Sequence, residues 1–482
     1  MAITLDDDEA AVAMRLAALQ ARAAAEPPPA KRAKKAAPSS KGPIPPWLAA
    51  AAGLSAALPF ATPGLPGVGG CIKAVPEHFC VTERASFTPD GAGDHIYITL
   101  RRTGMNTRAV AAALAAMLGC GEASVGFAGR KDRHAVVEQT FSVPAFDATT
   151  RTRDADGNRV GGEWLTPASL AARVAAGAIP GVGVAASPAP ARNRKKLRRG
   201  QLAGNAFAIV VTQLACPQGE ALARCGAIAA KLRTVGWPNY YGPQRFGNGG
   251  SGGARGLALL TGLAAARGAQ RRRLKRALYS PIARLHLSAV QSALFNACVA
   301  ARLRAGAFGR VLGGDLLQGP HGGFARPARC AGDCKGAIGG SSAEGGSDSC
   351  DCDTFRRGFL TYSGPMFGYR MKGRDAARRT GTAAGRLEAG VLAESGLVDE
   401  VFKHAKLDGT RRPARLLLRE DTAFSVEAHE ATGGLEFRFA LPRGCYATTF
   451  LREFLKATPA RPESDQVLGV RTRDVDAVLR DE

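Results

Sequence analysis

Residues 126–143 read GFAGRKDRHAVVEQTFSV, and this stretch decides how the first half of the chain folds. It contains two short runs of apolar and β-branched residues, typical of strands, on either side of a turn of glycine and charged residues at 129–134. Upstream, 95–100 alternates like a strand, and 106–118 carries apolar residues at helical spacing between an Asn cap and a glycine. The order strand, helix, strand, turn, strand predicts an α+β fold.

The composition is that of a folded and strongly basic protein. With 45% hydrophobic residues, the chain of 482 residues can build packed cores and is not wholly disordered. No apolar run is long enough for a transmembrane helix, so we expect no membrane partner. The net charge of +24 suits a polyanion such as nucleic acid, although coding bias toward arginine accounts for it about equally well. The densest groups of cations lie at 192–199 and 267–276.

The N-terminal residues are predicted to lie outside the fold. Residues 26–46, EPPPAKRAKKAAPSSKGPIPP, are rich in Pro and Lys and cannot form a core. The basic cluster at 31–35 is typical of a nuclear localisation signal, and equally of a solvated linker. We therefore expect a disordered tail over 1–68, a fold that starts near Gly69, and a nuclear protein, with the cytoplasm as a second location.

The eleven cysteines do not form the pattern of a small secreted disulfide framework. The acidic N-terminus lacks the features of a signal peptide, so we expect a reducing compartment. Four thiolates in one segment could hold a structural zinc. Their spacing is unusual and the surrounding stretch 330–353 is low in complexity, which favours a flexible loop and no metal. These four residues are Cys330, Cys334, Cys350 and Cys352.

Asp132 is the most informative acidic residue. It lies in the charged turn between the two strands, flanked by Lys131, Arg133 and His134. Neighbouring cations favour the ionised carboxylate, which suits nucleophilic or electrostatic work better than proton donation. An Asp in such a turn can also do no more than make turn hydrogen bonds, and the local sequence by itself favours that reading.

Aromatic residues are interleaved with polar ones at 239–246. Tyr240, Tyr241 and Phe246 stand beside Gln244 and Arg245, a combination that can stack on an unpaired base and hydrogen-bond to it. The same rings could instead face the core beneath a surface loop.

Several such motifs, taken in order, resemble the TruD family of pseudouridine synthases. The resemblance covers about residues 70–460 and is specific because every motif occurs in the expected order. Besides 126–143, the motifs are KAVPEHFCVTE (73–83), LRRGQLAGNAF (197–207), NYYGPQRFG (239–247), SALFNACVAARL (292–303) and LPRGCYATTFLREFL (441–455).

The resemblance implies an enzyme that isomerises uridine to pseudouridine in tRNA, by family type at U13, without a cofactor. Asp132 matches the essential aspartate, acting either as nucleophile at C1′ or as the base of a glycal route. Lys73 matches a basic residue near it. Asn239, Tyr241 and Tyr446 match residues that bind and stack on the target base. We expect contacts with the RNA backbone from Lys131, Arg133, Arg198, Arg199, Arg245 and Arg452.

The family fold is an α+β catalytic domain with a mixed, mostly antiparallel sheet, into which an α/β TRUD domain is inserted. We place the catalytic domain at 69–264 and 420–482 and the inserted domain at 265–419. The nuclear-signal-like tail suggests a eukaryote-like member, a monomer that also modifies other structured RNAs. Two alternatives are a catalytically silent RNA-binding protein on this fold and a zinc-dependent nucleic-acid module around the four cysteines.

Overall fold

The computed structural model describes residues 44–53, 58–150, 152–153, 159–160, 162–329, 351–371, 381–419 and 422–457. The basic cluster at 31–35 and three of the four cysteines considered for zinc lie outside these ranges. None of the helices described is both long and apolar enough to cross a membrane. All elements below belong to one compact unit that begins at Ile44.

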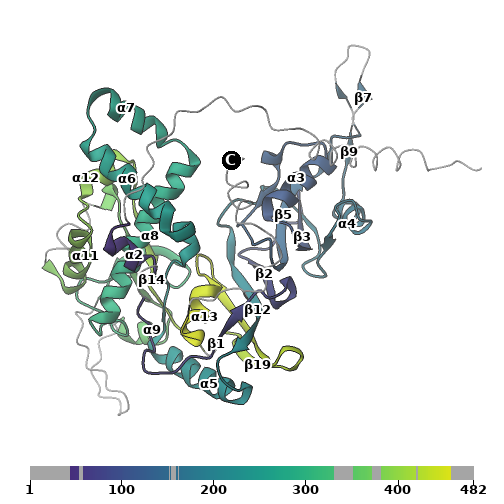
Figure 1. Cartoon of the computed structure of the whole chain (residues 1–482). Helices are drawn as coiled ribbons and strands as arrows, with labels where there is room; N and C mark the ends of the chain where they lie inside the picture. Colours follow the sequence, from purple (N-terminus) through teal and green to yellow (C-terminus); the bar gives the residue numbers. More distant parts are fainter. Residues whose placement is uncertain are drawn as a thin grey trace, which may run out of the picture. The chain divides into compact units, whose positions relative to one another are not determined.

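A mixed, mostly antiparallel sheet forms the centre of the α+β fold, as predicted (Figure 1). Its one parallel neighbour pair is β2 with β5, and Thr82 pairs with Glu138 there. The two strands predicted on either side of the charged turn are β4 (Gly126–Phe127) and β5. Along the sheet the order is β10 (Val182–Val184), β3 (His95–Thr103), β5 (Val136–Pro144), β2 (Phe79–Ala85), β12 (Leu202–Leu214), β20 (Gly434–Pro442) and β19 (Ser425–His429).

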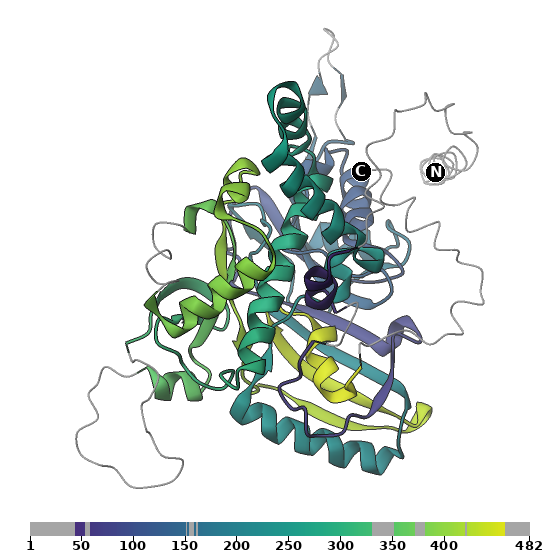
Figure 2. The ribbon, with the colours of Figure 1, turned by 60° about the vertical axis from the view of Figure 1, so that its left-hand side comes forward.

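Strands β12 and β20 come from distant parts of the chain and pair over most of their length. Phe207 lies opposite Phe439, and the two rings stack with centroids 5.2 Å apart. Figure 2 shows α5 (Gln218–Val235) and α13 (Ala447–Leu455) beside these strands. Both helices add side chains to the apolar core of the sheet, including Ile228 and Phe450. Burial of these side chains is the main force that holds the late strand in place.

Helix α3 (Thr107–Met117) covers another part of the sheet. It lies within the helix predicted at 106–118. The Asn106 side chain caps it by accepting a hydrogen bond from the backbone of Ala109, at 2.9 Å. Leu114 is buried against Leu100 and Phe141 of the sheet. The helix thereby fixes the segment that runs into the charged turn.

A second α/β part lies in sequence between β12 and β20. Its sheet has the order β15 (Gly322–Pro327), β14 (Leu316–Gly319), β16 (Thr361–Met366) and β17 (Thr410–Pro413). Helix α8 (Pro281–Arg304) packs against β16, with α6 (Ser251–Ala265), α11 (Ala383–Glu394) and α12 (Asp399–His404) around it. Leu260 and Leu263 of α6 share a core with α8, so the packing favours a start for this part before the predicted residue 265. The domain limits themselves remain a prediction.

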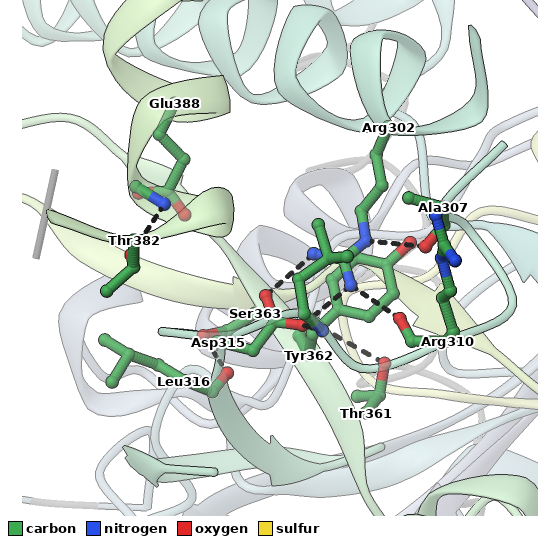
Figure 3. Close-up of polar contacts among 12 residues, drawn as sticks. Arg302, Ala307, Arg310, Asp315, Leu316, Thr361, Tyr362, Ser363, Thr382 and Glu388 are labelled. Carbon is green, nitrogen blue, oxygen red and sulfur yellow. Dashed lines mark hydrogen bonds and ion pairs between the residues drawn. The ribbon is translucent and has the colours of Figure 1, made fainter. Parts of the chain in front are cut away.

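A buried polar network holds α8 to its sheet (Figure 3). The Arg302 guanidinium donates to both carboxylate oxygens of Asp315, each at 2.7 Å, and lies 3.5 Å above the Tyr362 ring. Its Nε donates to the carbonyl of Ala307 at 3.1 Å. Because both charges are almost fully buried, loss of either one would leave the other without its partner. The network thus fixes β16, the neighbour of β17.

The predicted disordered tail over 1–68 is wrong for residues 44–53 and 58–68, which are folded. Helix α2 (Pro46–Ala51) starts with a proline in its first turn, where a missing N–H costs nothing. Leu48 packs with Phe246 in a small core against α8. The high proline content predicted disorder. A few apolar residues that pack against the rest of the fold are enough to order this segment. We call residues 44–53 and 58–62 the N-terminal strap.

Candidate active site

The predicted catalytic aspartate pairs with the predicted lysine. Lys73 directly follows β1 (Gly69–Ile72) in a left-handed conformation with φ 63°, and its Nζ lies 4.1 Å above the Phe79 ring. From there Nζ forms an ion pair with Oδ2 of Asp132. The Lys73 side chain is 10% exposed and that of Asp132 is 52% exposed. The carboxylate therefore has a fixed cation on one side and an open side for a substrate.

Buried hydrogen bonds support the loop that carries Asp132. The Thr107 hydroxyl accepts from the backbone N–H of Lys131 at 2.8 Å and donates to Oε1 of Gln139 at 3.0 Å. The Arg102 guanidinium donates to the hydroxyl of Thr107 at 3.2 Å and to the carbonyl of Asp132 at 3.4 Å. Burial lowers the pKa of Arg102 to about 10, so it stays charged at neutral pH. Sequence reasoning missed these supports, because a polar residue within a strand carries no local sign of its distant partners.

Asn239, Tyr241 and Tyr446 lie around the Arg412 side chain. The rings of Tyr241 and Tyr446 have centroids 5.8 Å apart and are tilted by 54°. Asn239 is buried, and its Nδ2 donates to the carbonyl of Pro413 at 2.9 Å. Its Oδ1 accepts from Nη2 of Arg412 at 2.9 Å. The Asn is therefore an orienting residue, and the ring pair is the part of this group that can face a base.

The two tyrosines are held differently. Asn296 of α8 bonds both to the backbone N–H and to the carbonyl of Tyr241, each at 2.9 Å. The Tyr241 ring also contacts Phe295 edge-on, at 5.7 Å. Tyr446 is the N-cap residue of α13 and is 38% exposed, with its pKa raised by partial burial. Tyr241 is thus fixed by its neighbours, while Tyr446 presents the more open ring.

Three of the residues predicted to contact the RNA backbone are exposed. Arg198 and Arg199 lie in the loop before β12, where Arg199 is 5.8 Å from the Phe127 ring. Arg133 follows Asp132 directly, and its Nε donates to the carbonyl of Gly104 at 2.8 Å. Their position leaves cationic atoms for phosphate, and contact of these three with RNA stays a prediction.

The other three predicted backbone contacts are engaged within the protein. Lys131 is buried and forms an ion pair with Glu83. Arg452 is buried, bonds to the carbonyl of Leu58, and has its pKa lowered by burial. Arg245 donates to two hydroxyls of α8, with Nη2 2.7 Å from Ser288. Lys131 and Arg452 are therefore poorly placed to contact the RNA backbone, because neither presents its charge to solvent.

No cluster of three or more His, Cys, Asp or Glu side chains suited to a metal occurs within the described ranges. Of the four cysteines considered for zinc, Cys352 begins the short helix α9 (Cys352–Arg356). Cys330, Cys334 and Cys350 lie outside the described residues.

Comparison with known proteins places this chain in the class of pseudouridine synthases. The sequence profile described as "tRNA pseudouridine synthase D (TruD)" matches residues 60–262 and 254–454. The chain belongs to the TruD family.

Curated relatives share this family over most of their length. The tRNA pseudouridine synthase D of Anaeromyxobacter dehalogenans is 36% identical over 85% of this chain and 99% of its own. That of Thermus thermophilus is 34% identical over 83% of this chain and 92% of its own. A solved structure from Methanosarcina mazei, assigned as a tRNA pseudouridine synthase D, aligns with a TM-score of 0.54 at 21% identity, covering 83% and 96% of the two chains. The last match confirms the fold, a catalytic domain with an inserted domain.

Proposed function

We propose that this protein converts uridine to pseudouridine in tRNA, at U13, with Asp132 as the essential group. The observation that carries the proposal is the ion pair of Lys73 and Asp132, in which the carboxylate of the family-type motif remains 52% exposed. The names of the curated relatives support tRNA as the substrate.

The reaction is an isomerisation and is balanced within the nucleotide. The bond between N1 and C1′ breaks, the uracil turns, and C5 bonds to C1′, while C5 loses a proton and N1 gains one. A uridine must leave its stack to expose these atoms, which costs a few kcal/mol. Stacking on Tyr446 and phosphate contacts from Arg198 and Arg199 would offset that cost. Asp132 then either attacks C1′ or removes a sugar proton, and Lys73 stabilises its charge before and after the step.

The wider substrate range and the location remain predictions. Other structured RNAs, a monomeric state and entry into the nucleus rest on the sequence, the last of these on the basic cluster at 31–35. The relatives named above are bacterial and do not support a nuclear location.

Tritium release from tRNA labelled at C5 of uridine tests the activity, because C5 loses its hydrogen only when the new bond forms. We expect release by the full chain, with one pseudouridine mapped to U13. Asp132→Asn should abolish release and retain tRNA binding. Asp408→Asn is the matched control, since Asp408 is a similarly exposed carboxylate, ion-paired with Arg370 at 3.4 Å. Release by Asp132→Asn at the wild-type rate would overturn the role of Asp132, and a product at another site would overturn the U13 assignment. Binding without release by the wild type would favour a silent RNA-binding protein.

A further inference from the structure

Arg412 of β17 lies buried among three aromatic rings of the candidate site. Its Cζ is 3.8 Å above the Tyr241 ring, 4.8 Å from that of Phe295 and 5.9 Å from that of Tyr446. Arg412 is 8% exposed. The second α/β part therefore contributes a cation to the place where we expect the target base to stack.

Only part of the hydrogen-bonding capacity of the Arg412 guanidinium is satisfied within the protein. Nη2 donates to Oδ1 of Asn239 at 2.9 Å and to the carbonyl of Gly444 at 2.7 Å. Nη1 is buried and has no hydrogen-bond partner, and no carboxylate of the described residues pairs with Arg412.

Nε of Arg102 and Nη1 of Arg452 are also buried without a partner among the described residues, but of these three arginines Arg412 is the one that lies against the rings of Tyr241 and Tyr446. Two other buried arginines of the described residues are fully paired. All three nitrogens of Arg415 donate to carbonyls, and Arg302 pairs with the carboxylate of Asp315. A buried donor without a partner costs stability, so its retention at a binding site points to an acceptor that arrives with the ligand.

We propose that Arg412 determines specificity for uracil by donating from Nη1 to O4 of the flipped target base. This inference rests on the proposed function. Uracil presents an acceptor at position 4, where cytosine presents an amino donor. An arginine can only donate hydrogen bonds, so it favours uracil and disfavours cytosine.

The surroundings favour a base as the source of the acceptor, although a phosphate oxygen of the same nucleotide has similar chemistry. Aromatic rings enclose the guanidinium, and rings bind bases. Nη1 is shielded from solvent. Tyr446 is the most exposed of the three rings, so its displacement by the entering base is the step that would free the donor.

The first test measures discrimination without turnover. In the Asp132→Asn background, tRNA transcripts with U or C at the modified position compete for the protein. We expect U to be preferred about 10- to 100-fold, the range for a hydrogen bond to a charged group. Arg412→Met should bring this ratio close to one while affinity for the C transcript holds. Arg438→Met is the control, because it removes a surface arginine that pairs with Glu436. If Arg412→Met still prefers the U transcript, the inference is overturned. An equal loss of affinity for both transcripts would also overturn it, because that is the result a purely structural role predicts.

The second test changes the RNA and so does not depend on how the variant folds. Single-turnover rates of the wild type are compared on tRNA carrying 4-thiouridine, 2-thiouridine or a phosphorothioate at the target. A loss of about tenfold with 4-thiouridine, absent in Arg412→Met, supports the inference. A loss confined to 2-thiouridine or to the phosphorothioate, or none at all, overturns it. If the wild type is inactive on unmodified tRNA, both the proposed function and this inference fail. If the wild type is active but the thio-bases do not slow it, only this inference fails.

Discussion

Lys73 and Asp132 form an ion pair in which the cation is buried and the carboxylate is half open to solvent. The lysine can therefore stabilise charge on Asp132 without blocking it. Lys73→Met should lower the single-turnover rate by about 10- to 1000-fold through loss of this preorganised charge. Binding of tRNA should change little, because the Lys73 side chain is only 10% exposed and is paired with Asp132. Rate and dissociation constant measured side by side check this, and an unchanged rate would contradict the role of Lys73.

The loop under Asp132 depends on one hydroxyl. Thr107→Val removes the acceptor for the Lys131 N–H and for Arg102, leaving buried donors unpaired. We expect the free energy of unfolding to fall by about 1–3 kcal/mol and the rate to fall with it. Thr234→Val is the control, since Thr234 is exposed on α5 and its hydroxyl bonds only within that helix. Denaturant melts compare the two variants; equal effects would show that Thr107 has no special role.

Glu453 gives stability a pH dependence of unusual sign. Burial raises the pKa of this carboxyl above its ordinary value of 4.5. The folded state therefore binds the proton more tightly than the unfolded state, and the contribution of Glu453 to stability declines as pH rises from about 4.5 toward the folded pKa. Glu453→Gln should remove this decline. Thermal melts from pH 4 to 8 should show the Tm of the wild type falling relative to that of the variant. A difference between the two Tm values that stays constant with pH would contradict this role of Glu453.

The N-terminal strap should matter for stability and for catalysis. Its residues 58–62 bond to α13: Glu453 accepts from the backbone of Ala61 at 3.1 Å, and Lys456 donates to the carbonyl of Thr62 at 2.7 Å. Since α13 starts next to Tyr446, removal of 1–62 should lower both Tm and activity. Removal of 1–43 breaks none of these contacts and should leave both unchanged. If the two truncated proteins melt alike, the strap has no such role.

Local patterns in the sequence were enough for the strands around Asp132, for helix α3 and for the fold class. The family resemblance pointed to Asn239, Tyr241 and Tyr446, of which the structure places the two tyrosine rings 5.8 Å apart. Arg412 escaped notice because it is one of 65 basic residues, and only its long-range neighbours distinguish it. Lys131 was expected to face RNA for a related reason. Lys131 lies in a loop and its partner Glu83 lies on β2, and no local pattern reveals such a pairing.

The pairing of β12 with β20 has a consequence for how the protein is made. β12 emerges from the ribosome long before its partner, so during synthesis it presents an unpaired edge. The edge is covered only when the last part of the fold has been translated, and such non-local pairing is slow to form. A nascent chain of this kind needs protection from aggregation in the interval. Nonsense alleles that end before β20 should therefore produce insoluble protein rather than a partly active enzyme.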